Sequence, residues 1–327
     1  MHSLSKKTKA TSRWNAIRAW FAGLLLISGL IVVVTHFSEL EHLVQLFRKA
    51  KPLWLFLAVV FQACTYFSVA TIWYLVLRFG GLHFSFLSLV PISVAKLFSD
   101  QAMPSGGVSG TAFFVTALSR RGIPTELCMA TMLVSLVTYY TAYLIVALTS
   151  VLLLWFYHKI NVWIVSITTI FVIVAVTIPI GILLLRRLGK KSPPAWLLHM
   201  QGLRGLLQDF GNAPVELLRN PILIISSIVL HSAVFLLDSG TLWIMLEALG
   251  QNVSLWVALP SFVFASIVAT VGPIPLGLGT FETTSVAMLG LLGIQLEAAF
   301  AATLLLRGFT LWIPMIPGLW WAKRELH

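Results

Sequence analysis

Charged residues are scarce in this chain of 327 residues, since only 10% are Asp, Glu, Lys or Arg, whereas 58% are hydrophobic. This composition leaves too little polar surface to cover a soluble globule of that length. The shortage of charge therefore excludes a soluble globular protein and predicts a polytopic membrane protein.

Acidic residues are the scarcer charges, because 22 Lys and Arg stand against 11 Asp and Glu, which gives a net charge of +11. In a soluble chain this excess would suggest nucleic acid as a partner. Here most basic residues lie in short segments beside apolar runs, where they set the topology and meet anionic lipid headgroups. We therefore expect membrane lipids as partners and no nucleic acid.

Cysteine is nearly absent, and Cys64 and Cys128 lie in apolar segments without the spacing of a metal site. We interpret both as small buried hydrophobic residues. The sequence also lacks a phosphate-cradling nucleotide motif, a Cys/His nucleophile pair and a close acidic pair. We therefore expect no metal, no cofactor, no direct use of ATP and no enzymatic activity.

Six apolar runs are long enough to cross a bilayer as α-helices, which takes about 20 residues. The first run follows a basic N-terminus and ends without a small-residue cleavage site, so we interpret it as a retained span with a cytoplasmic start. The fold class is therefore an all-α bundle of membrane helices. The six predicted spans are 14–36, 53–77, 126–156, 162–185, 221–249 and 297–321.

Two further apolar regions, 88–119 and 254–294, contain breaks. The first break is MPSGGVSG (103–110), and the second is GPIPLGLGTFE (272–282). Prolines remove backbone donors and glycines loosen the chain, so no continuous membrane helix can run through either stretch. In hydrocarbon such a break persists only where it packs in protein or faces a water-filled cavity, which makes both breaks candidate sites.

The two broken regions look like copies of one unit. Matched Gly, Pro and Glu are harder to obtain by chance than matched leucines in an apolar chain, so we predict an internal repeat of units near 81–130 and 250–301. At a shift of 171 residues the matches include Pro104 with Pro275, Gly106 with Gly277, Ser109 with Thr280 and Glu126 with Glu297, and at a shift of 169 they include Gly81 with Gly250 and Pro91 with Pro260.

The distribution of Lys and Arg indicates whether the broken regions cross the membrane. If both regions are re-entrant hairpins, most Lys and Arg lie on the cytoplasmic side, and if both cross fully, most lie outside. The positive-inside rule therefore favours hairpins. Three spans separate the two units, so we expect one hairpin to enter from each side. This arrangement is an inverted repeat, with breaks that meet near mid-membrane and with cytoplasmic N- and C-termini.

The loop at 186–220 has a pattern of its own. Ser192 and Pro193 are typical of a helix start, and apolar residues then recur at helical spacing from Trp196 to Phe210. This pattern fits a cytoplasmic amphipathic helix in the membrane interface, and it equally fits a helix packed against the membrane domain. No longer linker exists, so we expect 1–327 to form a single integral membrane domain. Oligomerisation is left open.

Each break also resembles a helix start. Ser109 and Thr280 stand at equivalent positions and are good N-cap residues for the second half of each hairpin. Half-helix N-termini present free N–H groups and a positive dipole end, which suit a phosphate oxygen. The alternative is that the glycines around them are ordinary turn glycines in a packed bundle.

Ionisable residues are rare in the apolar regions, where such groups are costly and usually form pairs that face a bundle interior. We predict ion pairs between Lys96 and Asp100, which share a helix face, and between Glu282 and Arg307. Two alternatives stay open. Glu282 could be a first-turn acid that satisfies the helix dipole, and Arg307 could be a structural counter-ion or could snorkel.

His231 and Asp238 lie seven residues apart on one face of the span 221–249. His231 is either a hydrogen-bonded core residue or a proton relay, and we favour the core residue. Asp238 has no obvious role in a dry core, so we predict a functional role for it.

These motifs resemble the lysylphosphatidylglycerol synthase transmembrane region, a flippase-like membrane domain that also occurs alone as small bacterial inner-membrane proteins. The resemblance rests on the two breaks, on Gly293-Ile294 and on Arg307, and covers nearly the whole chain. It implies membrane helices with re-entrant elements and the movement of a lipid between leaflets. Two-domain members add a soluble C-terminal synthase domain. Since this sequence ends at His327, soon after its last predicted span, we do not carry over the synthase activity.

The resemblance and the ionisable residues together predict a flippase-like protein of the bacterial inner membrane, which moves a phospholipid or polyprenyl-type lipid passively or with ion coupling. Arg307 and the N–H groups after Ser109 and Thr280 would hold an anionic or phosphate-bearing headgroup. The first break has Thr111 where the second has Glu282, which predicts two chemically asymmetric halves. The candidate lipid-binding residues are Pro104, Gly106, Gly107, Ser109, Pro275, Gly277, Gly279, Thr280, Glu282, Arg307, Asp238, Lys96 and Asp100.

Two other functions stay open. Inverted repeats with broken helices also serve small-solute and ion-coupled secondary transporters. A membrane accessory subunit of a lipid-modifying enzyme is the second alternative.

Overall fold

The computed structural model describes residues 51–102, 108–156, 158–190, 214, 216–272 and 277–326. The chain divides into two units, Met1–Lys49 and Ala50–His327, and all described residues belong to the second unit. The predicted first span at 14–36 lies outside the described residues, and so does 191–213, most of the predicted amphipathic loop. Both stay predictions.

Helices make up the described part of the chain, which contains no β-strand. Five helical segments are long and apolar enough to cross a membrane, as predicted for all spans after the first. They are α3 (Pro52–Phe79), α6 (Thr125–Phe156), α7 (Val162–Lys190), α11 (Pro221–Ala248) and a last segment formed by α14 (Leu296–Arg307), η2 (Gly308–Trp312) and α15 (Ile313–Leu326). The predicted all-α polytopic bundle is confirmed.

Shorter apolar helices occupy the two regions predicted to be broken. Helix α4 (Phe86–Ala102) is followed by α5 (Val108–Ser119), and α12 (Leu255–Val271) is followed by α13 (Thr280–Leu291). Both breaks fall where proline and glycine cluster in the sequence, as backbone chemistry requires. The four-residue α10 (Glu216–Arg219) precedes α11.

The helices around the first break recur around the second in order and length. Helices α3 and α11 have 28 residues each, α4 and α12 have 17 each, and α5 and α13 have 12 each. The turn glycines recur as well, because Gly81 and Gly250 both have positive φ, and so do Gly122 and Gly293. Helices α3 and α11 also both begin with proline, which suits the first helical position. The matching elements therefore extend from α3 to the last segment, beyond the units expected from the sequence.

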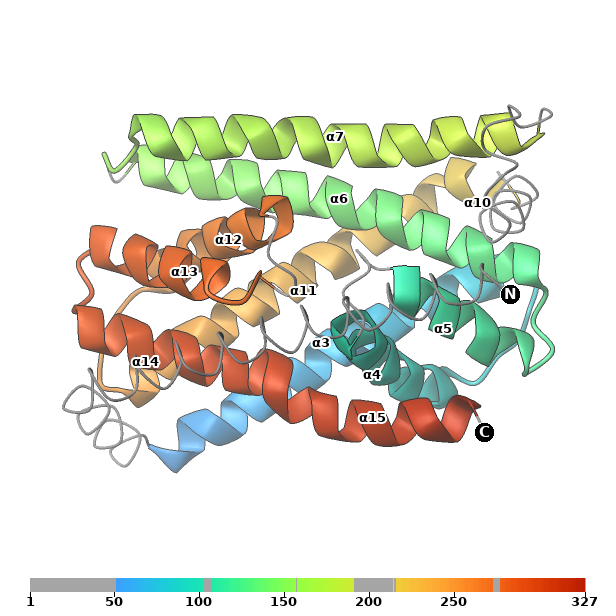
Figure 1. The fold of residues 1–327 in the computed structure, drawn as a ribbon, viewed down its shortest axis with the longest axis horizontal. Helices are drawn as coiled ribbons and strands as arrows, with labels where there is room; N and C mark the ends of the chain where they lie inside the picture. Colours follow the sequence, from blue (N-terminus) through green and yellow to red (C-terminus); the bar gives the residue numbers. More distant parts are fainter. Residues whose placement is uncertain are drawn as a thin grey trace, which may run out of the picture. The chain divides into compact units, whose positions relative to one another are not determined.

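Helices α3 and α11 pack along each other, and each broken region packs on a span from the other half, α4 on α15 and α12 on α6 (Figure 1). Glycine permits two of these contacts. A Cβ atom on Gly240 of α11 would lie 2.6 Å from the ring of Phe61 on α3, and one on Gly318 of α15 would lie 2.7 Å from Cβ of Phe98 on α4. The two halves are thus closely interlocked.

Two hydrophobic clusters lie at opposite ends of α3. Leu77, near its C-terminal end, packs in a cluster with Ile123 and Ala322, whereas Trp54, near its N-terminal end, packs against a second cluster that also contacts Ile294. The residues that flank α4–α5 therefore lie at the end of the bundle opposite to those that flank α12–α13.

The two flanks of α4–α5 also meet directly. A Cβ atom on Gly80, before α4, would touch the side chain of Leu127, after α5. Arg121, in the turn after α5, forms an ion pair with Glu325 at the end of α15. The segment thus leaves and returns at one end of the bundle, which is the geometry of a hairpin rather than of a crossing.

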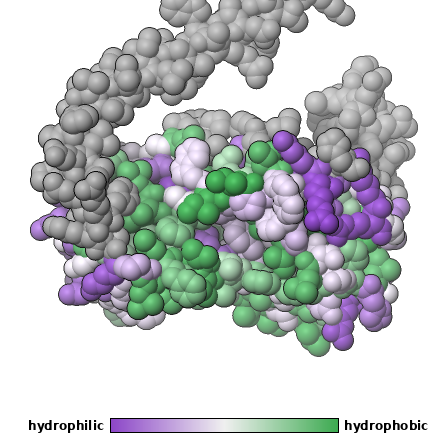
Figure 2. All heavy atoms as spheres, turned by 90° about the horizontal axis from the view of Figure 1, so that it is seen from below, coloured by the Kyte–Doolittle hydropathy of each residue, from purple (hydrophilic) through white to green (hydrophobic). Residues whose placement is uncertain are grey.

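The surface is apolar along the bundle. Figure 2 shows hydrophobic residues over most of one face and hydrophilic residues towards its two ends. Large hydrophobic side chains are also exposed on several spanning helices, such as Ile173 on α7, Ile225 on α11 and Phe56 on α3. An apolar surface of this kind suits contact with lipid tails.

Candidate functional site

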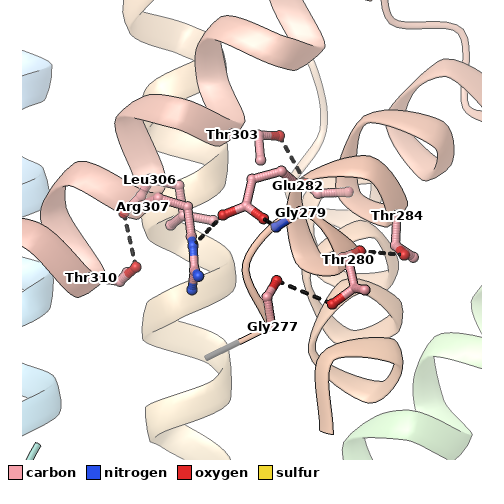
Figure 3. Close-up of polar contacts among 10 residues, drawn as sticks. Gly277, Gly279, Thr280, Glu282, Thr284, Thr303, Leu306, Arg307 and Thr310 are labelled. Atoms are coloured by element: carbon pink, nitrogen blue, oxygen red, sulfur yellow. Dashed lines mark hydrogen bonds and ion pairs between the residues drawn. The ribbon is translucent and has the colours of Figure 1, made fainter. Parts of the chain in front are cut away.

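Glu282 and Arg307 form the predicted ion pair beside the second break (Figure 3). Arg307 Nε donates to Glu282 Oε1 at 2.7 Å, and the backbone N–H of Gly279 donates to Glu282 Oε2 at 2.7 Å. Gly279 is the N-cap of α13, so one carboxylate neutralises both the guanidinium and the positive end of this half-helix. The two side chains are 17% and 11% exposed, so the pair lies mostly inside the protein.

Arg307 also contacts an aromatic ring of α13 and immediately precedes a π-helical turn. Its guanidinium carbon lies 5.0 Å from the centre of the Phe281 ring, within the range of a cation–π contact. The π-helical turn η2 begins directly after it, and single π-helical turns within helices frequently occur at functional sites. Arg307 is eleven residues after Leu296 in the last spanning segment. At the α-helical rise this is about 17 Å from the start of the span, near mid-membrane.

Lys96 and Asp100 form the other predicted ion pair, on α4 beside the first break. Lys96 Nζ donates to Asp100 Oδ2 at 2.7 Å, and the backbone N–H of Gly110 in the first turn of α5 donates to Asp100 Oδ1 at 2.9 Å. A Cβ atom on Gly110 would lie 2.3 Å from this oxygen, so only glycine admits the carboxylate. Asp100 therefore stabilises the start of α5 as Glu282 stabilises the start of α13.

The chemical asymmetry predicted from Thr111 and Glu282 concerns which element supplies the acid, because both breaks have a carboxylate. Thr111 does replace an acid in the first break, but Asp100 supplies the carboxylate from the preceding helix arm. In both breaks a carboxylate joins a basic side chain to the N-terminus of the second half-helix. The elements that carry the two side chains differ, because Lys96 and Asp100 both lie on α4, whereas Glu282 lies on α13 and Arg307 on α14.

The predicted N-cap roles of Ser109 and Thr280 are wrong. Thr280 is the first residue of α13, after the N-cap Gly279, and its hydroxyl donates to the carbonyl of Gly277 at 3.1 Å. Ser109 lies inside α5, and its hydroxyl donates to the carbonyl of Ser99 at 2.9 Å. Both hydroxyl groups thus tie the second half-helix to the preceding segment.

Both the backbone conformation and the close packing at position 277 require glycine. Its φ is +61°, and a Cβ atom there would lie 2.4 Å from Cβ of Ala269 on α12. The residue therefore lets the chain turn back against α12 before α13 begins. Four further predicted site residues, Pro104, Gly106, Gly107 and Pro275, lie outside the described residues.

Asp238 lies apart from both ion pairs, on α11, where it contacts α3. Gln62 of α3 is buried, and its Nε2 donates to Asp238 Oδ1 at 3.0 Å and to Thr241 Oγ1 at 3.0 Å. Neither Gln62 nor Thr241 was among the site residues predicted from the sequence. A lone amide in the middle of an apolar span was the signal that could have found Gln62.

His231 is a core residue, as the favoured interpretation held. It is buried, and its Nδ1 lies 3.1 Å from the hydroxyl of Thr138 on α6 and 3.1 Å from the carbonyl of Ser227. Cys128 is buried, as predicted, whereas Cys64 is exposed, so its predicted burial is wrong. Within the described ranges, no three His, Cys, Asp or Glu side chains lie close enough to hold a metal ion.

These observations define the class of the molecule as a polytopic helical membrane protein with two broken helices, each with an ion pair whose carboxylate accepts a hydrogen bond from the N-terminal end of the second half-helix. The family model of the lysylphosphatidylglycerol synthase TM region matches residues 20–318. The chain belongs to this family, as the resemblance of the two breaks indicated. No curated protein matches it.

Proposed function

We propose that this protein moves a phosphate-bearing membrane lipid between the leaflets of the bacterial inner membrane. The observation that carries the proposal is the ion pair between Glu282 and Arg307 at the start of α13, inside the spanning region. The family name supports it, because it refers to a domain associated with a phospholipid.

The chemistry of this pair suits an exchange of anions. Glu282 occupies the two groups that would attract a phosphate, the guanidinium of Arg307 and the N–H of Gly279. A lipid phosphate that enters beside the break competes with the carboxylate for both groups, and phosphate binds well to guanidinium and to helix N-termini. The pair thus keeps the empty site neutral and releases the guanidinium of Arg307 and the N–H of Gly279 to the headgroup.

The first break offers the same exchange at the other half. Asp100 accepts hydrogen bonds from Lys96 and from the N–H of Gly110. The side chains of Lys96 and Asp100 are each 23% exposed. We propose that the two halves form an inverted repeat and that the headgroup passes from one break to the other while its tails stay in lipid. Both termini would then lie in the cytoplasm, as the positive-inside rule predicts.

The test is lipid movement by purified protein in vesicles. A fluorescent phospholipid placed in both leaflets is bleached from outside by a reductant that does not cross the membrane. Wild-type protein is expected to expose the inner-leaflet label, and Arg307→Gln is expected to slow this by about 10-fold or more, since one charge-assisted phosphate contact is worth about 1.5–3 kcal/mol.

The matched control is Arg219→Gln, which removes an exposed arginine at the end of α10. It is expected to move lipid at the wild-type rate. Equal rates for the Arg307 and Arg219 variants would exclude Arg307 from the path. A solute or ion flux without lipid movement would instead favour the secondary-transporter alternative.

A further inference from the structure

Asp238 is the only acidic residue of α11 that lies far from both helix ends. It stands ten residues before Ala248 and seventeen after Pro221. At the α-helical rise the nearer end is about 15 Å away. A charged carboxylate at such a depth costs roughly 2.5–3.5 kcal/mol on insertion scales. A compensating group is therefore required.

The partners of Asp238 do not compensate its charge. Gln62 Nε2 is a neutral amide donor, and it is shared between Asp238 Oδ1 and Thr241 Oγ1. The hydroxyl of Thr241 donates to the carbonyl of Leu237 at 2.9 Å, so its proton is directed away from the carboxylate. Over the described ranges, the ion pairs are formed by other residues, and none involves Asp238. Among the residues that the structure describes, no positive charge therefore compensates Asp238.

The titratable groups around this position do not supply that charge either. Tyr66 on α3 and Tyr139 on α6 are the ionisable groups that interact electrostatically with Asp238, and both are neutral phenols. His231 on the same helix packs edge-on against Tyr139 at 5.6 Å and is held by Thr138 of α6.

The other helices that pack against α11 add no free cation near the site. Helix α12 contains no titratable residue. Helix α14 contains Glu297, which is exposed, and Arg307, which is held by Glu282. The residues of α10 lie before the start of α11, far from Asp238.

Asp238 lies at the contact between α3 and α11, which are the first helices of the two matching series α3–α5 and α11–α13. Its position therefore links the two halves of the protein. Phe61, next to Gln62, fits against Gly240 so closely that a Cβ atom would lie 2.6 Å from its ring. The hydrogen bond from Gln62 to Asp238 thus lies beside a close contact between these helices. A change of charge at Asp238 alters the contact that joins the halves, and repeat transporters work by moving one half against the other.

We propose that Asp238 is a proton-binding site that couples lipid movement to the proton gradient, with Gln62 as its positioning residue. This inference rests on the proposed lipid movement. One proton from the aqueous phase on one side binds to a carboxylate oxygen and forms the neutral acid. After the two halves rearrange, the same proton leaves to water on the other side, and the carboxylate is restored.

A first experiment tests proton binding without any lipid movement. The purified protein in vesicles is titrated with acid and base while the infrared band of protonated carboxylic acids is recorded. Wild type is expected to show a band that Asp238→Asn lacks and that Gln62→Ala shifts, because the hydrogen bond to the carboxyl group is lost. Glu297→Gln, which removes an exposed acid, is expected to leave this band unchanged. A wild-type band that survives Asp238→Asn overturns the proposal.

A second experiment tests coupling in vesicles that hold labelled phospholipid and a pH difference of one unit. One coupled proton shifts the final distribution of the lipid between leaflets by up to about 10-fold per pH unit. Wild type and Asp238→Glu are expected to show this shift, and Asp238→Asn is expected to show no response to the gradient. Size-exclusion profiles of the variants establish that each one folds.

The outcomes separate the two proposals. Absence of lipid movement by wild type under every condition refutes the proposed function. Lipid movement by wild type that does not respond to pH refutes proton coupling alone. A response to a sodium gradient in place of the pH gradient also overturns the proposal, because it makes Asp238 a sodium site.

Discussion

The ion pair between Glu282 and Arg307 makes a quantitative prediction that a double-mutant cycle can test. Arg307→Met removes the guanidinium, which donates to Glu282 at 2.7 Å and lies 5.0 Å from the Phe281 ring centre. The remaining carboxylate is only 17% exposed and keeps the N–H of Gly279 as its donor. Loss of one partner from a buried pair costs about 3–5 kcal/mol, so we expect a loss of about 3 kcal/mol at this slightly exposed site.

The complementary change, Glu282→Gln, removes the negative charge but leaves an amide oxygen that can accept from Gly279. We expect it to cost about 2 kcal/mol, because Arg307 loses its charged partner. The double variant contains no unpaired charge. It should therefore cost about 3 kcal/mol rather than the sum of the single losses, which gives a coupling energy of about 2 kcal/mol.

The assay is equilibrium unfolding of the four proteins in mixed micelles, followed by tryptophan fluorescence. A coupling energy below about 0.5 kcal/mol would equal that of an exposed surface pair. That result would refute the reasoning that Glu282 and Arg307 neutralise each other inside the protein. It would also remove the basis for an exchange of Glu282 with a lipid phosphate.

Two further predictions concern the first break and the topology. Gly110→Ala is expected to lower the unfolding midpoint by displacing Asp100 from the start of α5, a loss of about 1–2 kcal/mol, whereas Gly290→Ala, with no atom within 4 Å of its new Cβ, should be neutral or stabilising. Thermal unfolding in detergent compares the two, and equal midpoints would contradict the role of Gly110. Cysteines placed at Arg120 and Gln251 are expected to react with an impermeant maleimide from opposite sides of the membrane, and labelling of both from one side would refute the inverted hairpins.

The breaks and the ion pairs could be predicted from the sequence because they follow from backbone chemistry, from the spacing of residues along a helix and from the free-energy cost of a charge in hydrocarbon. Proline and glycine break a helix wherever they cluster. Lys96 and Asp100 are one helical turn apart, so they meet on any helix. Arg307 and Glu282 meet because charges in hydrocarbon require partners and few candidates exist.

The remaining contacts depend on which helices are neighbours, and the apolar pattern of a membrane span does not encode that choice. Gln62 and Asp238 are 176 residues apart, and only the packing of α3 along α11 brings them together. The link from Asp100 to Gly110 likewise depends on how α5 folds back beside α4. The N-cap prediction for Thr280 was wrong because a hydroxyl group can donate as well as accept.

The most direct test of the central claim compares two labelled lipids in vesicles with and without the protein. One lipid has a phosphate headgroup, and the other has the same tails with an uncharged sugar headgroup. Recognition by Arg307, Lys96 and half-helix N–H groups predicts that the protein accelerates movement of the phospholipid between leaflets by at least about 10-fold over the glycolipid, the value of one charge-assisted contact. Equal acceleration of both lipids, or of neither, would contradict the account.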